Sequence, residues 1–307
     1  MEYDTICMSG GGLIGFAFIG ALEYLNNSNY INSIKNYVGT SIGSVLSLLL
    51  VCGYSPLELG DFIIDFDFTK INHDISIENI ITNYGISNGE RLEFIINSFI
   101  KNKFNVDNIT FKQLFELTNK NLIIIGTNFS KSHEEVFSHN ETPDMSVITA
   151  IRISISIPVF FTPVLYNNDY YVDGCITNNF PIKYCNKNTT IGLYIRINNN
   201  NNVTNIINII IGCINIITDT INFKDIICSE NIIQIDYDTN QKDKEFINFD
   251  FTIDYKLKLI NLGQVFAKKF VENQSTNICK NILDDIINKI IQIEYNLKLE
   301  TKETQTD

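Results

Sequence analysis

Three consecutive glycines, Gly10, Gly11 and Gly12, interrupt the segment MSGGGLIGFAFIGAL at residues 8–22, and a fourth follows at Gly15. An apolar strand that runs through glycines into a helix forms a turn whose backbone N–H groups are not covered by side chains. Dinucleotide-binding folds, phosphate-binding loops and hydrolases with an oxyanion hole all use such a turn. The rest of the sequence has to decide among these three uses.

The first fifty residues alternate between two patterns. Residues 3–8 and 34–39 are short apolar runs typical of buried strands, whereas residues 13–25 and 42–52 have helical spacing. This order of strand, helix, strand and helix is typical of parallel α/β folds. Further strands are expected at 121–129, 134–139, 170–174 and 190–197, and further helices from 53–59 onward and at 87–101, 111–117, 144–156, 203–221 and 255–273.

The chain has 307 residues, of which 45% are hydrophobic, enough for a large α/β core. We expect a core at residues 1–198 and a helical and strand continuation at 199–275 that packs on the same domain. A C-terminal helix and a polar tail are expected at 276–307.

The net charge and the cysteine content limit which partners and cofactors are expected. The net charge is -12 and the basic residues are scattered, so the chain lacks the basic stripe of a nucleic-acid-binding protein. Seven cysteines without a CxxC pair indicate reduced thiols, and neither a metal nor another cofactor is expected. The N-terminus does not resemble a signal peptide, and the apolar stretches are too short or too interrupted to cross a bilayer. We expect a cytoplasmic protein that attaches at most to the periphery of a membrane, holding it mainly through apolar surface.

The two nucleotide uses of the glycine turn are disfavoured. A dinucleotide site expects an acidic residue about 20 positions after the glycines, but the chain has none between Glu23 and Glu58. A phosphate-binding loop requires a Gly-Lys-Ser or Gly-Lys-Thr sequence, and none follows the glycine turn.

The segment GTSIG, residues 39–43, matches the Gly-x-Ser-x-Gly nucleophile elbow. In that turn the flanking glycines allow a strand to turn sharply into a helix, and the serine hydroxyl projects at the positive end of the helix. Taken alone, such a pentapeptide is more often a simple turn of small residues. As a nucleophile, Ser41 would need a group that accepts its proton.

Asp173 is the candidate base. The common Ser-acid-His order requires a late histidine, but the three histidines are His73, His133 and His139, each better interpreted as a solvated loop residue. Asp173 ends the apolar run YYVDG, at the end of a strand where α/β sites assemble. An aspartate before glycine is also a common turn residue.

Together these residues resemble the patatin-like phospholipases, which are lipid acyl hydrolases. The resemblance covers most of the chain. It rests on four segments that occur in the family's order: SGGGLIGFAFIGAL, GTSIGSV, AIRISISIPVFFTPV at residues 150–164 and DGCITNNFP at residues 173–181.

The resemblance implies a three-layer α/β/α sandwich around a mainly parallel sheet, acting on a lipid substrate at a membrane or droplet surface. It implies that Ser41 is the nucleophile and Asp173 its base. The oxyanion donors would come from Gly10, Gly11 and Gly12, with motif support from Gly15, Gly39, Gly43 and Gly174.

Two positions depart from the family pattern. Ile14 stands where the family commonly has Lys or Arg, and Cys175 stands where it usually has Gly or Ala. These departures motivate the alternative of a catalytically inactive lipid-binding or scaffold protein. Cys175 itself is disfavoured as a nucleophile because no histidine or basic cluster lies near it in sequence. An interaction protein that docks through the apolar helix at 203–221 is a third possibility, although helically spaced Ile, Leu and Val are more often core.

Overall fold

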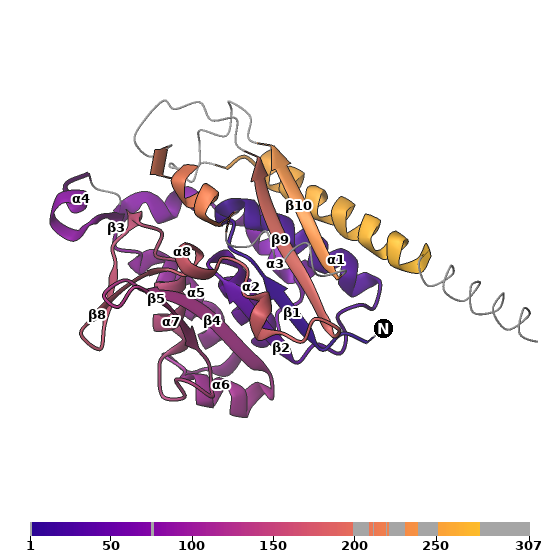
Figure 1. Ribbon diagram of the computed structural model, residues 1–307, viewed down its shortest axis with the longest axis horizontal. Coiled ribbons are helices and arrows are strands. Elements are labelled where there is room, and N and C mark those ends of the chain that lie inside the picture. The colour runs from indigo at the N-terminus through magenta and orange to yellow at the C-terminus, as the bar shows by residue number, and fades with distance from the viewer. Residues whose placement is uncertain are drawn as a thin grey trace, which may run out of the picture.

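The computed structural model describes residues 2–74, 77–198, 209–210, 212–218, 220, 231–238 and 251–276. Figure 1 shows a twisted central sheet with helices packed against it.

Eight strands of the described chain form the central sheet, in the order β10-β9-β1-β2-β4-β8-β7, with β5 pairing beside β4. The pairings from β10 to β4 are all parallel, whereas β5 and β8 run antiparallel to β4, and β7 runs antiparallel to β8. The prediction of a mainly parallel α/β sheet is therefore confirmed. The strands are β1 (Thr5–Met8), β2 (Asn36–Thr40), β4 (Asn121–Asn128), β5 (His133–Phe137), β7 (Val164–Tyr166), β8 (Asp169–Asp173), β9 (Thr190–Asn198) and β10 (Ile232–Asp238).

Helices connect and cover the strands. They are α1 (Phe16–Asn27), α2 (Ile42–Val51), α3 (Pro56–Asp65), α4 (Ile77–Asn83), α5 (Glu90–Phe104), α6 (Phe111–Thr118), α7 (Val147–Ser154), α8 (Cys175–Asn178) and a helix at 253–276. Short 3-10 turns are η1 (Gly12–Gly15), η2 (Phe68–Asp74) and η3 (Ile182–Tyr184), and β3 (Gly85–Ser87) pairs in parallel with β6 (Val159–Phe161) outside the main sheet. The sequence did not predict β3, β6, β7, α4 or α8, which are short or carry no distinctive motif, and it predicted strand structure within 199–275 without locating β10.

Helix α3 begins as its sequence predicts. The Ser55 hydroxyl accepts from the Glu58 N–H at 3.2 Å, and the Glu58 carboxylate accepts from the Ser55 N–H at 2.7 Å. Pro56 occupies the first turn. This reciprocal pair satisfies donors that would otherwise lack partners at the helix start.

Alternating side chains of the strands bury two faces of the sheet. Ile6 and Met8 belong to the large core beneath the longer helices, whereas Cys7 belongs to a smaller cluster on the opposite face. The smaller cluster also contains Val38, Phe180, Ile182 and Tyr194. Helices thus cover both faces, as expected for a three-layer sandwich, but the two apolar layers are unequal.

The helix at 253–276 packs directly on α1. A Cβ at Gly263 would lie 1.7 Å from the Ala17 carbonyl oxygen, and a Cβ at Gly20 would lie 1.8 Å from the Ile260 carbonyl oxygen. The two glycines therefore allow the helix backbones to touch. Near the start of the same helix, buried Lys256 donates to the carbonyl oxygens of Ile64 and Phe66, at the end of α3.

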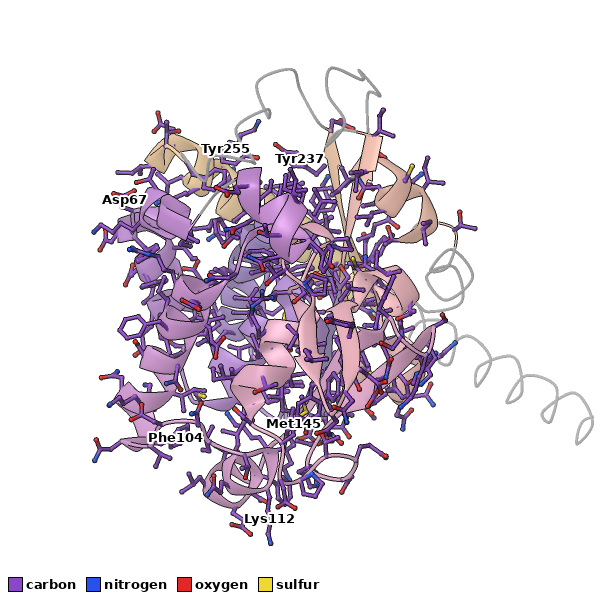
Figure 2. All side chains as sticks on the ribbon, turned by 90° about the vertical axis from the view of Figure 1, so that its left-hand side faces the viewer. Asp67, Phe104, Lys112, Met145, Tyr237 and Tyr255 are labelled. Carbon is purple, nitrogen blue, oxygen red and sulfur yellow. The ribbon has the colours of Figure 1, made fainter. Side chains whose placement is uncertain are left out.

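A contact between tyrosines joins this helix to the sheet. The hydroxyls of Tyr237 on β10 and Tyr255 lie 3.0 Å apart, and both residues are labelled at the top of Figure 2. The helix at 253–276 therefore contacts both β10 and α1.

The predicted helix at 203–221 is described only in part. Its described residues are helical, but Ile209, Ile216 and Ile217 are 45%, 62% and 43% exposed, so the expectation that its isoleucines form core is wrong for these three. The predicted tail at 277–307 lies outside the described residues. Within the described ranges, no helix has both the length and the apolar character needed to span a bilayer.

The substitution Gly263→Ala tests the close packing of the two helices. Because the new methyl group would overlap the Ala17 carbonyl, we expect the free energy of unfolding to fall by about 1–3 kcal/mol. The control is Gly212→Ala, since a Cβ at helical Gly212 would meet no atom within 4 Å. Urea denaturation followed by circular dichroism measures both, and equal stability of the two variants would contradict this packing.

Candidate active site

Ser41 lies between the end of β2 and the start of α2. Its backbone has φ 53° and ψ −126°, a strained conformation for a residue with a side chain. A Cβ at Gly39 would lie 2.4 Å from the Gly43 carbonyl oxygen, and a Cβ at Gly43 would lie 2.4 Å from the Met8 carbonyl oxygen. The glycines of GTSIG are therefore needed for the sharp turn that the sequence predicts.

Asp173 reaches Ser41 from the last position of β8. The Ser41 hydroxyl donates to Asp173 Oδ2 at 2.8 Å, and the other carboxylate oxygen, Oδ1, accepts from the Cys175 N–H at 2.8 Å. Gly174 makes the following turn possible, because a Cβ there would lie 2.4 Å from the Ile125 carbonyl oxygen on β4. The structure thus brings together the two residues that the sequence singled out.

Burial sets the electrostatics of this pair. Ser41 is 4% exposed and Asp173 is 0% exposed. Desolvation raises the pKa of Asp173 to about 6, although the hydrogen bonds from Cys175 and Ser41 oppose the rise. Burial, with the adjacent negative charge of Asp173, also raises the pKa of the Cys175 thiol. At neutral pH the carboxylate is therefore mainly ionised and the thiol protonated.

The glycine turn lies against the Ser41 turn. A Cβ at Gly10 would lie 3.2 Å from the Ser41 Cβ, and the Gly10 N–H donates to the Asn179 carbonyl at 3.1 Å. The Gly10 N–H is therefore already engaged, which leaves Gly11 and Gly12 as the predicted oxyanion donors. They stand at the start of η1, where the first N–H groups have no partner within the turn. Gly15 lets this turn approach α2, since a Cβ there would lie 2.5 Å from the Ile42 side chain.

The described histidine side chains do not join this pair. His133 is exposed and its Nδ1 lies 2.7 Å from the Glu134 carbonyl, while the His139 ring stacks on Phe115 with centroids 4.0 Å apart. The side chain of His73 lies outside the described part of the structure.

Sequence reasoning assigned no role to the residues that hold the backbone of the pair. The Ser154 hydroxyl accepts from the Ser41 N–H at 2.9 Å, and the Ser156 carbonyl accepts from the Asp173 N–H at 2.9 Å. Both serines belong to AIRISISIPVFFTPV, one of the four segments of the family resemblance. This segment could therefore have drawn attention to the two serines. It does not indicate that they would contact the backbone of Ser41 and Asp173.

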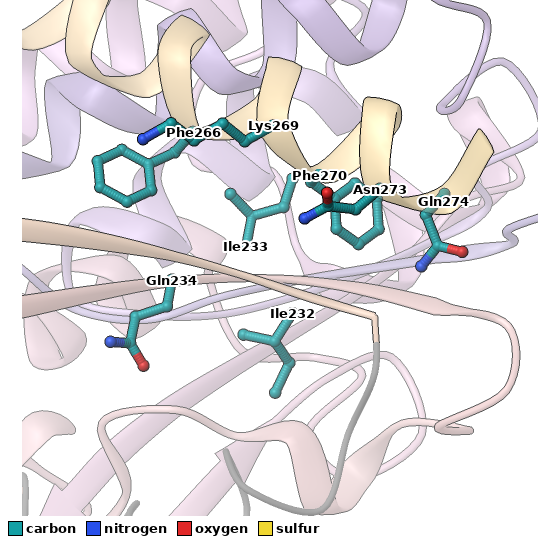
Figure 3. A pocket seen from close by; sticks show the side chains of 8 residues that line it. All are labelled: Ile232, Ile233, Gln234, Phe266, Lys269, Phe270, Asn273 and Gln274. Carbon is teal, nitrogen blue, oxygen red and sulfur yellow. The ribbon is translucent and has the colours of Figure 1, made fainter. Parts of the chain in front are cut away.

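A separate cavity of about 540 Å³ lies between β10 and the helix at 253–276 (Figure 3). Its lining mixes apolar and polar side chains and includes none of the predicted site residues: Ile232, Ile233, Gln234, Phe266, Lys269, Phe270, Asn273 and Gln274. This cavity therefore does not mark the Ser41 site.

Comparison with known families identifies the part of the chain that contains Ser41 and Asp173. The model of the patatin-like phospholipase family matches residues 6–185, which include the glycine turn, Ser41 and Asp173. The chain belongs to the patatin-like phospholipase family. The match also covers Ser154 and Ser156, which accept hydrogen bonds from the backbone N–H groups of Ser41 and Asp173.

Two viral relatives are similar to more than half of the chain. A protein named "Probable lipid hydrolase 463L" from Invertebrate iridescent virus 6 is 36% identical over 191 residues, which are 60% of this chain and 65% of the relative. An uncharacterized protein, R571, from Acanthamoeba polyphaga mimivirus is 37% identical over 185 residues, 59% of this chain and 61% of the relative. The similarity thus spans less than two thirds of either relative.

Solved structures share the patatin-like fold at low sequence identity. VipD from Legionella pneumophila superposes with a TM-score of 0.53 and 16% identity over 85% of this chain and 67% of VipD. ExoU, solved in its complex with SpcU from Pseudomonas aeruginosa, gives a TM-score of 0.52 and 18% identity over 89% of this chain and 52% of the matched chain. These likenesses concern the fold alone.

The buried Asp173 should reduce stability at high pH. Its folded pKa of about 6 lies above the roughly 3.9 of an unfolded aspartate, so the native state binds the proton more tightly. The resulting stabilisation is full below about pH 4 and is lost as the pH rises through 6. We therefore expect Asp173→Asn to be more stable than the parent at pH 8, by at most about 3 kcal/mol, and to lose this advantage near pH 4.

Urea denaturation at a series of pH values measures this difference. Asp169→Asn is the control, because Asp169 starts the same strand but pairs with Lys131, and its hydrogen bond with that lysine lowers its pKa. An advantage of Asp173→Asn that does not change between pH 4 and pH 8 would contradict the burial of a charged carboxylate at this position.

Proposed function

We propose that this protein is a lipid acyl hydrolase that cleaves fatty-acyl esters through a Ser41 acyl-enzyme, with Asp173 as the base. The observation that carries the proposal is the 2.8 Å hydrogen bond from the Ser41 hydroxyl to Asp173 Oδ2. Because a serine hydroxyl is a weak nucleophile, a carboxylate that accepts its proton directly is the group that the reaction requires.

The first half of the reaction forms the acyl-enzyme. Ser41 Oγ attacks the ester carbonyl as its proton passes to Asp173, and the carbonyl oxygen becomes an oxyanion. When the tetrahedral intermediate collapses, the bond to the alcohol breaks and Asp173 returns the proton to the departing oxygen. The raised pKa of Asp173 supports this cycle, since a carboxyl that titrates at about 6 can both accept and release a proton near neutral pH.

The glycine turn and α2 would stabilise the oxyanion. The N–H groups of Gly11 and Gly12 are the proposed donors, and Ser41 sits at the positive end of the ten-residue helix α2. Losing one such donor typically costs about 3 kcal/mol of transition-state stabilisation. A side chain at Gly11 would lie 2.8 Å from the Ile195 Cδ1, so a glycine suits the close approach that the donor needs.

Hydrolysis of the acyl-enzyme completes the cycle. A water molecule gives its proton to Asp173 and attacks the acyl carbonyl, and the same N–H donors stabilise the second oxyanion. Collapse releases the fatty acid and returns the proton to Ser41 Oγ. The name of the iridescent virus relative, a probable lipid hydrolase, supports a lipid ester as substrate. We place that substrate at a membrane or droplet surface, in the cytoplasm.

Loss of either residue of the pair should abolish turnover. We expect Ser41→Ala and Asp173→Asn each to lower kcat/KM for a fluorogenic long-chain acyl ester by about 10³-fold or more. Ser47→Ala and Asp169→Asn are matched controls that should retain activity, because Ser47 lies deep within α2 and Asp169 begins β8.

A fluorophosphonate probe distinguishes the proposal from an inactive relative on the same fold. An activated Ser41 would be phosphonylated in the parent and not in Ser41→Ala. A folded parent that neither reacts with the probe nor hydrolyses the ester would overturn the hydrolase proposal and favour a lipid-binding or scaffold protein.

Activity should follow the ionisation of Asp173. Only the carboxylate accepts the Ser41 proton, so kcat/KM should be low at pH 5 and rise through a midpoint at about pH 6 to a plateau near pH 8. Initial rates in buffers of constant ionic strength, with circular dichroism to verify folding at each pH, measure the profile. A rate independent of pH between 5 and 8 would contradict the role of Asp173 as the base.

A further inference from the structure

The end of α7 contacts the backbone of both residues in the Ser41–Asp173 pair. Ser154 Oγ accepts from the Ser41 N–H at 2.9 Å, and the Ser156 carbonyl accepts from the Asp173 N–H at 2.9 Å. A single residue, Ile155, separates these two contacts in sequence. One short segment thus holds two residues that are 132 positions apart in the chain.

The sheet order explains why such a segment is needed. Ser41 follows β2 and Asp173 ends β8, and β4 lies between these strands. Neighbouring strands are about 4.8 Å apart, so β2 and β8 are separated by roughly 10 Å. The hydrogen bond between the two side chains must therefore cross β4 near Ile125 and Gly126, where strand pairing alone does not fix it.

Helix α7 is seated close to β4. A Cβ at Gly126 would lie 2.6 Å from the Ile153 side chain, so a glycine on β4 lets the end of the helix approach the sheet. In the same region Gly126 pairs with Asp173 across the β4–β8 ladder. The end of α7 is thereby placed over the strand that the Ser41–Asp173 hydrogen bond has to cross.

Ser41 in particular depends on a partner outside its own strand. Its strained φ of 53° and ψ of −126° turn its N–H away from the regular ladder of β2. The Ser154 hydroxyl, which is 0% exposed, accepts from that N–H. A buried N–H without a partner is costly, so removing the hydroxyl would favour a different backbone conformation at Ser41.

Arg152 braces the same segment. Its buried guanidinium donates to the Ser156 hydroxyl and to the carbonyl oxygens of Asn88 and Thr162. The Ser156 hydroxyl in turn donates to the Arg152 carbonyl at 2.5 Å. These hydrogen bonds connect the turn after α7 to two other parts of the chain. They fix the backbone next to Ser154.

We propose that Ser154 is a positioning residue for the nucleophile: its hydroxyl holds the Ser41 backbone in the strained turn and so keeps the Ser41 hydroxyl within reach of Asp173. This role rests on the proposed hydrolase function. It predicts that Ser154 affects the reactivity of Ser41 rather than the binding of the substrate.

The test compares Ser154→Ala with Ser47→Ala. Both remove the hydroxyl of a serine that is 0% exposed, but the Ser47 hydroxyl has no hydrogen-bond partner among the described residues. We expect Ser154→Ala to lower kcat by about 10- to 100-fold, as a displacement of about 1 Å does, with KM within twofold of the parent. Ser47→Ala should behave like the parent.

Labelling with a fluorophosphonate separates positioning from folding. We expect Ser154→Ala to react about 10- to 100-fold more slowly than the parent and to reach the same final extent. A parent-like rate with a reduced final extent would mean that Ser154 only supports folding, and would overturn the proposal. An unchanged rate and extent would overturn it as well.

Ser154→Cys provides a second variant in case the alanine variant does not fold. It nearly preserves the volume of the side chain but replaces the hydroxyl with a sulfur, which is a weak acceptor. The same slowed labelling with full extent is expected, and a parent-like rate would overturn the proposal. An unlabelled parent would instead overturn the hydrolase function, and this positioning role with it.

Discussion

The candidate site depends on one buried hydrogen bond that spans an intervening strand. Ser41 and Asp173 meet at 2.8 Å although β4 separates their strands. The turns that carry these two residues require segments of backbone to approach one another closely. Gly39, Gly43 and Gly174 meet this demand, since each would place a Cβ within about 2.4 Å of a neighbouring carbonyl oxygen. Gly39 and Gly43 thus permit the sharp turn at Ser41, and Gly174 permits the turn after Asp173 to approach β4.

Burial of the pair links reactivity to stability. Direct transfer of a proton from serine to a carboxylate requires a carboxylate more basic than one in water, and desolvation raises the pKa of Asp173 to about 6. The same desolvation disfavours the folded state at neutral pH, where the group is charged. The hydrogen bonds from Ser41 and Cys175 limit this penalty without cancelling it. The buried carboxylate that the proposed chemistry uses as a base therefore lowers the stability of the folded protein.

The sequence predicted those features whose geometry is local. The turn at Ser41, the start of α3 at Ser55 and the strand end at Asp173 each depend on neighbours within a few residues, so short motifs revealed them. The role of Ser154 could not be predicted, because its partner is 113 residues away. The burial of Ile216 was wrongly predicted for a related reason: helical spacing identifies an apolar face but not what lies against it.

The glycine turn is also held by parts of the chain that lie outside the region matched by the family model. That match ends at residue 185, but Ser9, directly before the glycines, donates its N–H to the Leu193 carbonyl, and its hydroxyl accepts from the Ile195 N–H, both on β9. Helix α1 follows the same turn, and the helix at 253–276 contacts it through Gly20. Since these contacts hold the turn from both sides, the position of the Gly11 and Gly12 N–H groups is set partly by chain that lies after residue 185.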